Sequence, residues 1–258
     1  MRGKLLRRSV ILGILLTVFT VAFPSAIQAD PLVLQGFDLF QSIPGGTKVD
    51  LGAIGDDVPF KGVPLGTFNF GSGPVNTFNV DTIVHRLADA SPANPTIPIQ
   101  LVALQLMSVN PINNNFLFVT LQSDRGGPPS LGMMTINFGP EGSPHGTFDS
   151  TLSVFFDVRV GSLTGDIVFS GNKTLMAFGE PWSHFPPPGA VLIFDVNFML
   201  NGQNQLNDFF AIDPVMHTNP DNSMHTVTTG TIPEPMTLSL LATGLAGLAA
   251  RAYRRRKA

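Results

Sequence analysis

The sequence predicts an all-β protein with an antiparallel, sandwich-like body between two apolar ends. Three observations support this class. Apolar and polar residues alternate in several short runs, turn residues separate these runs, and 26 Gly and 22 Pro among 258 residues leave little room for long helices. The 21 phenylalanines supply bulky apolar side chains for a core between strands.

The clearest strand is predicted over residues 152–160, where apolar side chains alternate with mostly polar ones. A period of two is typical of a strand with one buried face. Residues 192–200 and 78–84 repeat this pattern, and residues 116–121 are apolar on both faces except for Thr120, as in a strand within a core. A short segment at 84–90 is the helical candidate of the body.

Turn signals lie between these runs, because Gly and Asn accept positive φ and Pro cannot continue a hydrogen-bonded ladder. The clusters are at residues 44–46, 71–74, 113–115, 126–129, 139–142, 186–189 and 201–202. The segment 139–146 could divide the body into two β-domains. One continuous sandwich is the simpler interpretation, because all-β domains of this length are common.

Charge is distributed unevenly along the chain. Nine of the 15 Lys and Arg lie in the first eight and the last eight residues, so residues 9–250 hold six cations against 18 acids, a net charge of −12. An acidic body argues against nucleic acid as a partner, because phosphate backbones require a basic surface. The absence of Cys excludes disulfides, thiolate metal sites and a Cys nucleophile.

Residues 1–29 have the three parts of a secretory signal peptide. Lys4, Arg7 and Arg8 form the basic start, an apolar run follows from Val10, and cleavage is predicted after Ala29. The apolar run is shorter than the roughly 20 residues that a membrane-spanning helix needs. We therefore expect export by the general secretory machinery and removal of this segment.

No catalytic motif is present in the body: the nucleophile elbow, the His-Glu-x-x-His pair, the P-loop and the dinucleotide fingerprint are all missing. His145 and Asp149 would lie about 13 Å apart on one strand face, too far for one metal ion. His217 and His225 flank a loop with Asp221, and we interpret them as solvated loop residues. We predict no enzyme activity, no metal and no cofactor.

A pair of acids and the single tryptophan could each have a structural role or a ligand-binding role. Asp56 and Asp57 could bind Ca²⁺, but without a ligand repeat they are more typical of a turn. Trp182, near His184 and Phe185, could form an aromatic sugar-binding patch, but large aromatic residues mostly serve burial.

The C-terminal tail, residues 231–258, combines three elements. Pro233, Glu234 and Pro235 form an extended tripeptide, because Pro fixes φ and restricts its neighbour. An apolar helix is predicted over residues 236–253, and its length of about 27 Å is marginal for the ~30 Å membrane core. The apolar residues that we expect in the membrane include Met236, Leu240, Leu241, Leu245 and Leu248.

A basic cluster ends the chain: Arg251, Arg254, Arg255, Arg256 and Lys257. Cations beside a membrane helix keep that end in the cytoplasm, so this cluster is predicted to set the topology. The polar segment 226–231 is expected to hold the tail away from the body.

This tripeptide, helix and basic cluster resemble the PEP-CTERM sorting tail of bacterial envelope and secreted proteins. The resemblance implies that an exosortase, a membrane-embedded processing enzyme of bacteria that make exopolysaccharide, recognises Pro233, Glu234 and Pro235 and cuts the tail. It covers about a tenth of the chain. The stretch Asp81-Thr82-Ile83-Val84 and the Gly- and Phe-rich strands are also similar to the bodies of such proteins, for which the resemblance implies no activity.

The expected organisation is therefore a signal peptide at 1–29, an extracytoplasmic β body at 30–230 and a sorting tail at 231–258. The expected function is an envelope or extracellular-matrix protein, anchored briefly in the inner membrane and then processed, with exopolysaccharide as a possible partner. The alternatives are a secreted hydrolase and a module that binds carbohydrate, calcium or ice.

Overall fold

The computed structural model describes residues 32–71, 73–140, 143–193 and 207–232. These residues form fourteen β-strands and two short 3₁₀ turns, η1 (Gly52–Ile54) and η2 (Gln122–Arg125). Every pairing between the strands is antiparallel, so the predicted all-β antiparallel class is confirmed. The predicted signal helix and C-terminal helix lie outside the described residues.

Twelve strands belong to one sheet that closes on itself. In chain order these strands are β1 (Gly36–Val49), β2 (Val58–Gly62), β5 (Thr82–Arg86), β6 (Thr96–Leu104), β7 (Leu106–Ser108), β8 (Leu117–Leu121), β9 (Ser130–Phe138), β10 (His145–Val160), β11 (Ile167–Ser183), β12 (Phe210–Ala211), β13 (Val215–Thr218) and β14 (Met224–Thr229). Pairings β1–β5 and β10–β11 connect the sheet back to itself. The two layers expected of a sandwich are thus opposite walls of one closed sheet.

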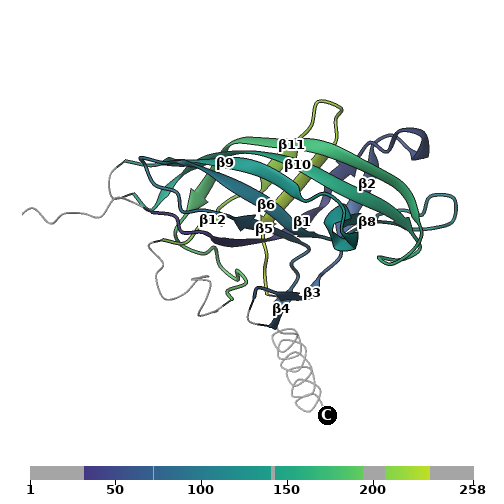
Figure 1. The fold of residues 1–258 in the computed structure, drawn as a ribbon, viewed down its shortest axis with the longest axis horizontal. Coiled ribbons are helices and arrows are strands. Elements are labelled where there is room, and N and C mark those ends of the chain that lie inside the picture. The colour runs from purple at the N-terminus through teal and green to yellow at the C-terminus, as the bar shows by residue number, and fades with distance from the viewer. Residues whose placement is uncertain (1–31, 72, 141–142, 194–206, 233–258) are drawn as a thin grey trace, which may run out of the picture.

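The two longest strands, β10 and β11, lie side by side in one wall of the closed sheet (Figure 1). β10 pairs along nearly its whole length with β11, while its other edge pairs first with β9 and then with β8. The side chains of Leu152, Val154, Phe156 and Val158 point inward and are buried, as the alternation predicted. The segment 139–146 connects β9 to β10, which are neighbours in the sheet.

The opposite wall is organised by a bend in β1. Its first half pairs with β5 and its second half with β2, and β14 pairs along the other edge. Between Ser42 and Thr47 the register against β14 shifts, so the residues 44–46 are a bulge inside one strand and not the predicted turn between two strands. Gly46 is needed there, because a Cβ at this position would lie 2.8 Å from the Cβ of Thr226.

The carboxylate of Asp81 fixes this bend. It accepts hydrogen bonds from the backbone N–H and the hydroxyl of Ser42, at 2.8 and 2.9 Å, and from the hydroxyl of Thr82 at 2.7 Å. Asp81 is 2% exposed. Burial raises the pKa of its carboxyl group, and the three hydrogen bonds oppose that shift. β1, β5 and the chain before β5 are therefore held together at one point.

A second, smaller core covers the outer face of β1 and β5. The hairpin of β3 (Gly66–Asn69) and β4 (Pro74–Phe78) forms a separate two-stranded sheet, which lies below the main sheet in Figure 1. Phe37 of β1 packs edge-on against Phe68 and Phe70 of this hairpin. β1 and β5 are consequently covered by apolar side chains on both faces.

One end of the closed sheet is filled by an aromatic and ionic cluster. Phe209 stacks on Trp182 and packs edge-on against Phe148, and Arg86 lies 5.5 Å from the Phe209 ring. Arg86 also forms a buried ion pair with Asp38 at 3.0 Å. Burial raises the pKa of Asp38 to about 6, against the lowering effect of Arg86. Trp182 is fully buried, so its predicted role in burial is confirmed.

Several local expectations were wrong. The segment 84–90 begins in strand β5 and has no helix, because Val84 and Arg86 are needed on the inner face of the sheet. The strand expected over 78–84 is interrupted, since Phe78 has a φ of 54° and the chain turns between β4 and β5. The segment 226–231 is not a polar lead-in. Most of it is β14, and Thr231 pairs with Ala190.

Other expectations fall partly or wholly outside the described residues. Of the strand expected over 192–200, only residues 192 and 193 are described, and the turn expected at 201–202 lies outside the described residues. Within the described residues no helix is long and apolar enough to cross a membrane, and the predicted helix 236–253 lies outside them.

The Asp81 interaction gives a stability prediction. Replacing Asp81→Ala removes three hydrogen bonds and leaves the partly buried N–H of Ser42 without its acceptor, so the free energy of unfolding should fall by about 2–4 kcal/mol. Denaturant unfolding measures this change. The matched control Asp56→Ala removes an exposed turn acid and should change stability by less than about 0.5 kcal/mol. Equal effects of the two substitutions would contradict the role of Asp81.

Candidate functional site

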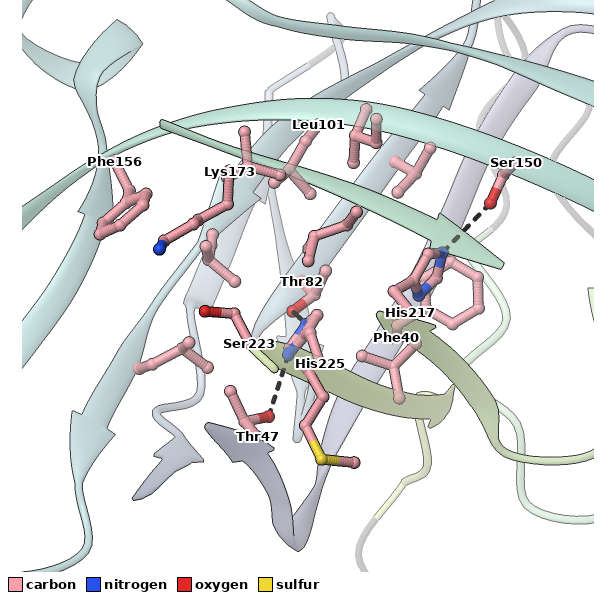
Figure 2. Close-up of a pocket in the computed structure, with 18 of the residues that line it drawn as sticks. Phe40, Thr47, Thr82, Leu101, Ser150, Phe156, Lys173, His217, Ser223 and His225 are labelled. Atoms are coloured by element: carbon pink, nitrogen blue, oxygen red, sulfur yellow. Dashed lines mark hydrogen bonds between the residues drawn. The ribbon is translucent and has the colours of Figure 1, made fainter. Parts of the chain in front are cut away.

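The walls of the closed sheet line a cavity of about 70 Å³. Side chains from both walls line it (Figure 2). Most of them are aliphatic or aromatic: Phe40, Val49, Val84, Ile99, Leu101, Leu104, Leu106, Val119, Met134, Phe148, Leu152, Val154, Phe156, Leu175, Met224 and Val227. The cavity is therefore an apolar space.

Two histidines form the main polar part of the cavity wall. His217 of β13 and His225 of β14 are directly paired across the two strands, so their side chains leave the sheet on the same face. That face is the inner one, because Val215 and Val227, which are paired in the same ladder, are also buried. Figure 2 shows both imidazoles among the lining residues.

His225 is held by two threonine hydroxyls. Nδ1 lies 2.9 Å from Oγ1 of Thr47, and Nε2 lies 3.4 Å from Oγ1 of Thr82. The hydroxyl proton of Thr82 is donated to Asp81, so this oxygen is left as an acceptor for His225. His225 therefore carries its proton on Nε2 and accepts from Thr47 at Nδ1. The chain from Ser42 through Asp81 and Thr82 to His225 links the bend of β1 to the cavity.

His217 has a weaker set of partners. Its Nε2 lies 3.2 Å from Oγ of Ser150, on the opposite wall. Its Nδ1 is buried and makes no hydrogen bond with the described residues. The backbone of His225 lies near enough to oppose the pKa shift of this ring, although no hydrogen bond of good geometry forms. A buried polar atom in this state is costly unless another molecule satisfies it.

Burial keeps both imidazoles neutral. It lowers the pKa of His217 to about 4 and, together with the nearby His217, lowers the pKa of His225 to about 3. The cavity wall therefore presents two uncharged rings at neutral pH.

The charged side chains of the lining are two lysines. Lys173 of β11 forms an ion pair with Asp221 in the loop between β13 and β14. Lys48 lies on the bent part of β1 and is partly exposed. In Figure 2, Lys173 and Phe156 lie toward one end of the cavity, and His217 and Ser150 lie toward the other. The end of the cavity near Lys173 thus carries a cation that is paired with Asp221, and the end near His217 is neutral and polar.

Ser150 and His217 have the contact of a nucleophile and a base, but the surroundings do not support that chemistry. A general base works best with a pKa near the working pH, and the pKa of His217 is far below it. No carboxylate hydrogen-bonds its Nδ1 within the described residues, so the orienting member of a triad is missing there.

In the described part of the chain, no group of three or more His, Asp or Glu side chains converges. Asp149 accepts hydrogen bonds from the Asn137 amide and from the backbone N–H of Gly179. His145 is exposed on the same strand, β10. Asp56 and Asp57 lie in an exposed turn.

The structure corrects the interpretation of the histidines. His217 and His225 are strand residues that line the cavity and not solvated loop residues. His217 lies two residues from Val215, and His225 lies two residues from Val227, so each histidine shares a strand face with an apolar residue. This spacing could have indicated that both histidines face inward. His184 is buried and donates from Nδ1 to the carbonyl of Asp208 at 2.6 Å. His85 stacks on Phe37, with ring centroids 4.1 Å apart.

The predicted sorting and export residues lie outside the described residues. They are Ala29 at the signal cleavage point, the tripeptide at 233–235, the apolar helix at 236–253 and the basic cluster at 251–257. The last described strand, β14, ends at Thr229, and the backbone N–H of Ile232 still donates to the carbonyl of Gly189. The folded body thus extends to the residue before Pro233.

The neutral histidines predict how stability depends on pH. The pKa values of His217 and His225 are near 6.5 in the unfolded state and lower in the folded state. Between the folded and unfolded pKa values, the unfolded chain therefore binds more protons than the folded chain. Stability should therefore fall as pH falls from about 6.5 to 4, and each histidine contributes a slope of about 1.4 kcal/mol per pH unit. His217→Leu should reduce the slope by about this amount, as measured by denaturant unfolding at several pH values.

The exposed His145→Leu variant is the control and should leave the slope unchanged. Asp38 has a raised pKa and contributes with the opposite sign between pH 6 and 3.8, but it is present in every variant and cancels in the comparison. An unchanged slope in His217→Leu would show that this ring is not held neutral by the cavity.

Comparisons with known proteins support the interpretation of the tail. The family model described as the PEP-CTERM protein-sorting motif matches residues 231–256. Comparisons with curated proteins and with solved structures found no match to the chain. A tail of this kind implies an exported protein that is targeted to an exosortase and processed at the membrane. The chain therefore carries a PEP-CTERM protein-sorting motif that begins at Thr231, in the last two residues that the structure describes.

Proposed function

We propose that the protein is a non-enzymatic component of the bacterial cell envelope or extracellular matrix, delivered and then released through its C-terminal tail. The observation that carries this proposal is the sorting motif at residues 231–256, which begins where the β body ends. The secretory signal at 1–29 exports the body. The apolar helix and the basic cluster then hold the C-terminus in the inner membrane until an exosortase cuts near Pro233, Glu234 and Pro235.

The position of β14 adds a physical constraint to this route. Thr231 pairs with Ala190 and Ile232 donates to Gly189, so no spacer separates the folded sheet from the tripeptide. A processing enzyme binds its substrate as an extended chain, and the two prolines of the tripeptide favour such a chain because Pro fixes φ and has no N–H for a sheet. The body is thus expected to lie close to the membrane surface until the tail is cut.

The chemistry of the body favours a non-enzymatic role. The Ser150–His217 contact lacks an orienting carboxylate in the described structure, and the pKa of His217 is too low for a base at neutral pH. The acidic charge of residues 9–250 suits a soluble exported body more than a nucleic-acid partner. Exopolysaccharide stays a possible partner in the surroundings that such tails imply.

Replacing Pro233, Glu234 and Pro235 together with Ala should abolish processing while leaving the helix and the basic cluster intact. The variant should accumulate with its tail in the membrane fraction, and the unaltered protein should lose the mass of the tail. Mass spectrometry of both proteins, in cells with and without an exosortase, measures this difference.

Thr237→Ala, which alters the tail outside the tripeptide, is the matched control and should be processed normally. An unaltered protein that keeps its full tail in cells with an exosortase would contradict the sorting proposal. Processing of the triple variant at the normal rate would contradict recognition of the tripeptide.

A further inference from the structure

The cavity has the size of a site for a small molecule. One water molecule needs about 10–15 Å³ of such space, so about 70 Å³ has room for several waters or for a molecule of about the size of benzene. Native cores are packed closely, with few voids larger than one water molecule. A space of this size between Leu101, Leu152 and Phe156 is therefore not explained by packing alone.

Water is a poor occupant of most of this space. A buried water needs two to four polar partners, and apolar cavities of this kind stay dry. The hydrogen-bonding groups are confined to a few side chains, among them Ser150, His217 and Ser223. Several are already engaged, because Ser150 bonds to His217 and the hydroxyl of Ser223 accepts from the backbone N–H of Asp50. The aliphatic middle of the cavity offers water no partner.

The charges around the cavity select an uncharged occupant. His217 and His225 are neutral, and Lys173 is already paired with Asp221. An anion or cation placed among the aliphatic side chains of the middle would lose its hydration with no counter-charge beside it, which is costly. Lys48 is partly exposed and keeps its own access to water.

One polar group on the occupant would have a partner. Nδ1 of His217 is buried, lies in the wall of the cavity and makes no hydrogen bond with the described residues. A hydroxyl or carbonyl group could satisfy it, since an imidazole nitrogen donates or accepts according to its tautomer. This end of the cavity also holds Ser150 (Figure 2).

From these observations we infer that the cavity is a binding site for a small, uncharged, mainly apolar molecule with one hydrogen-bonding group, which lies against His217. The apolar part fills the space between β6, β10 and β11. The proposal is independent of the sorting tail, so either can fail without the other.

Phenol is a suitable probe, because it is neutral at pH 7, has one hydroxyl group and is close to benzene in size. The full chain, reconstituted in lipid nanodiscs with ¹³C-methyl methionine, provides an internal comparison. Met134 is 3% exposed and lines the cavity, whereas its neighbour Met133 is 47% exposed on the outer face. Phenol should shift the Met134 methyl signal saturably and leave that of Met133 nearly unchanged. Benzoate, with the same ring and a negative charge, should bind at least about tenfold more weakly.

Two variants test the location. Leu101→Phe should fill the cavity and weaken phenol binding at least about tenfold, while Leu131→Phe, on the exposed face of β9, should bind as the unaltered protein does. If Leu101→Phe fails to fold, Val154→Leu adds a single methylene group to the lining of the same cavity. This smaller change should weaken phenol binding by less than tenfold. The absence of a saturable Met134 shift, an equal response to benzoate, or unchanged binding in the filled variants would each overturn the proposal.

Discussion

The hydrogen bonds to the buried carboxylate of Asp81 are the interaction on which the arrangement of the closed sheet depends. β1 must bend so that one strand can pair with β5, β2 and β14, and the bend leaves the backbone N–H of Ser42 in need of an acceptor. Asp81 supplies it and also orients Thr82. Since Thr82 in turn accepts from His225, the same carboxylate that holds the wall together sets the tautomer of a cavity residue.

The cavity is a consequence of how the two walls are closed. At one end, Trp182, Phe209 and the Arg86–Asp38 ion pair occupy the interior. Farther along, aliphatic side chains of moderate size face one another and leave space between them. Burial in that space drives His217 and His225 to the neutral state. An exported, acidic body with a neutral, apolar interior is suited to carry or hold a small uncharged molecule outside the cytoplasm.

The sequence was sufficient for the class of fold and for the sorting motif of the tail, and insufficient for the site. Alternation placed Leu152, Val154 and Phe156 on a buried face correctly, because a strand buried on one side repeats every two residues. The same reasoning missed the bend of β1, because Pro44-Gly45-Gly46 is equally typical of a turn between strands. The histidine pair was missed although the two strands that carry it form a local hairpin, in which His217 and His225 share a face with Val215 and Val227. The opposite wall with Ser150 could not be predicted, because it lies 67 residues from His217 in the sequence.

The most direct test of the account is a crystal structure of the protein derivatised with xenon, which enters dry apolar cavities but does not replace well-bonded water. We predict a xenon atom inside the closed sheet, between Leu101, Leu152 and Phe156, with Asp81 still bonded to Ser42 and Thr82. A cavity filled by hydrogen-bonded waters, or walls that meet and leave no space, would contradict the account.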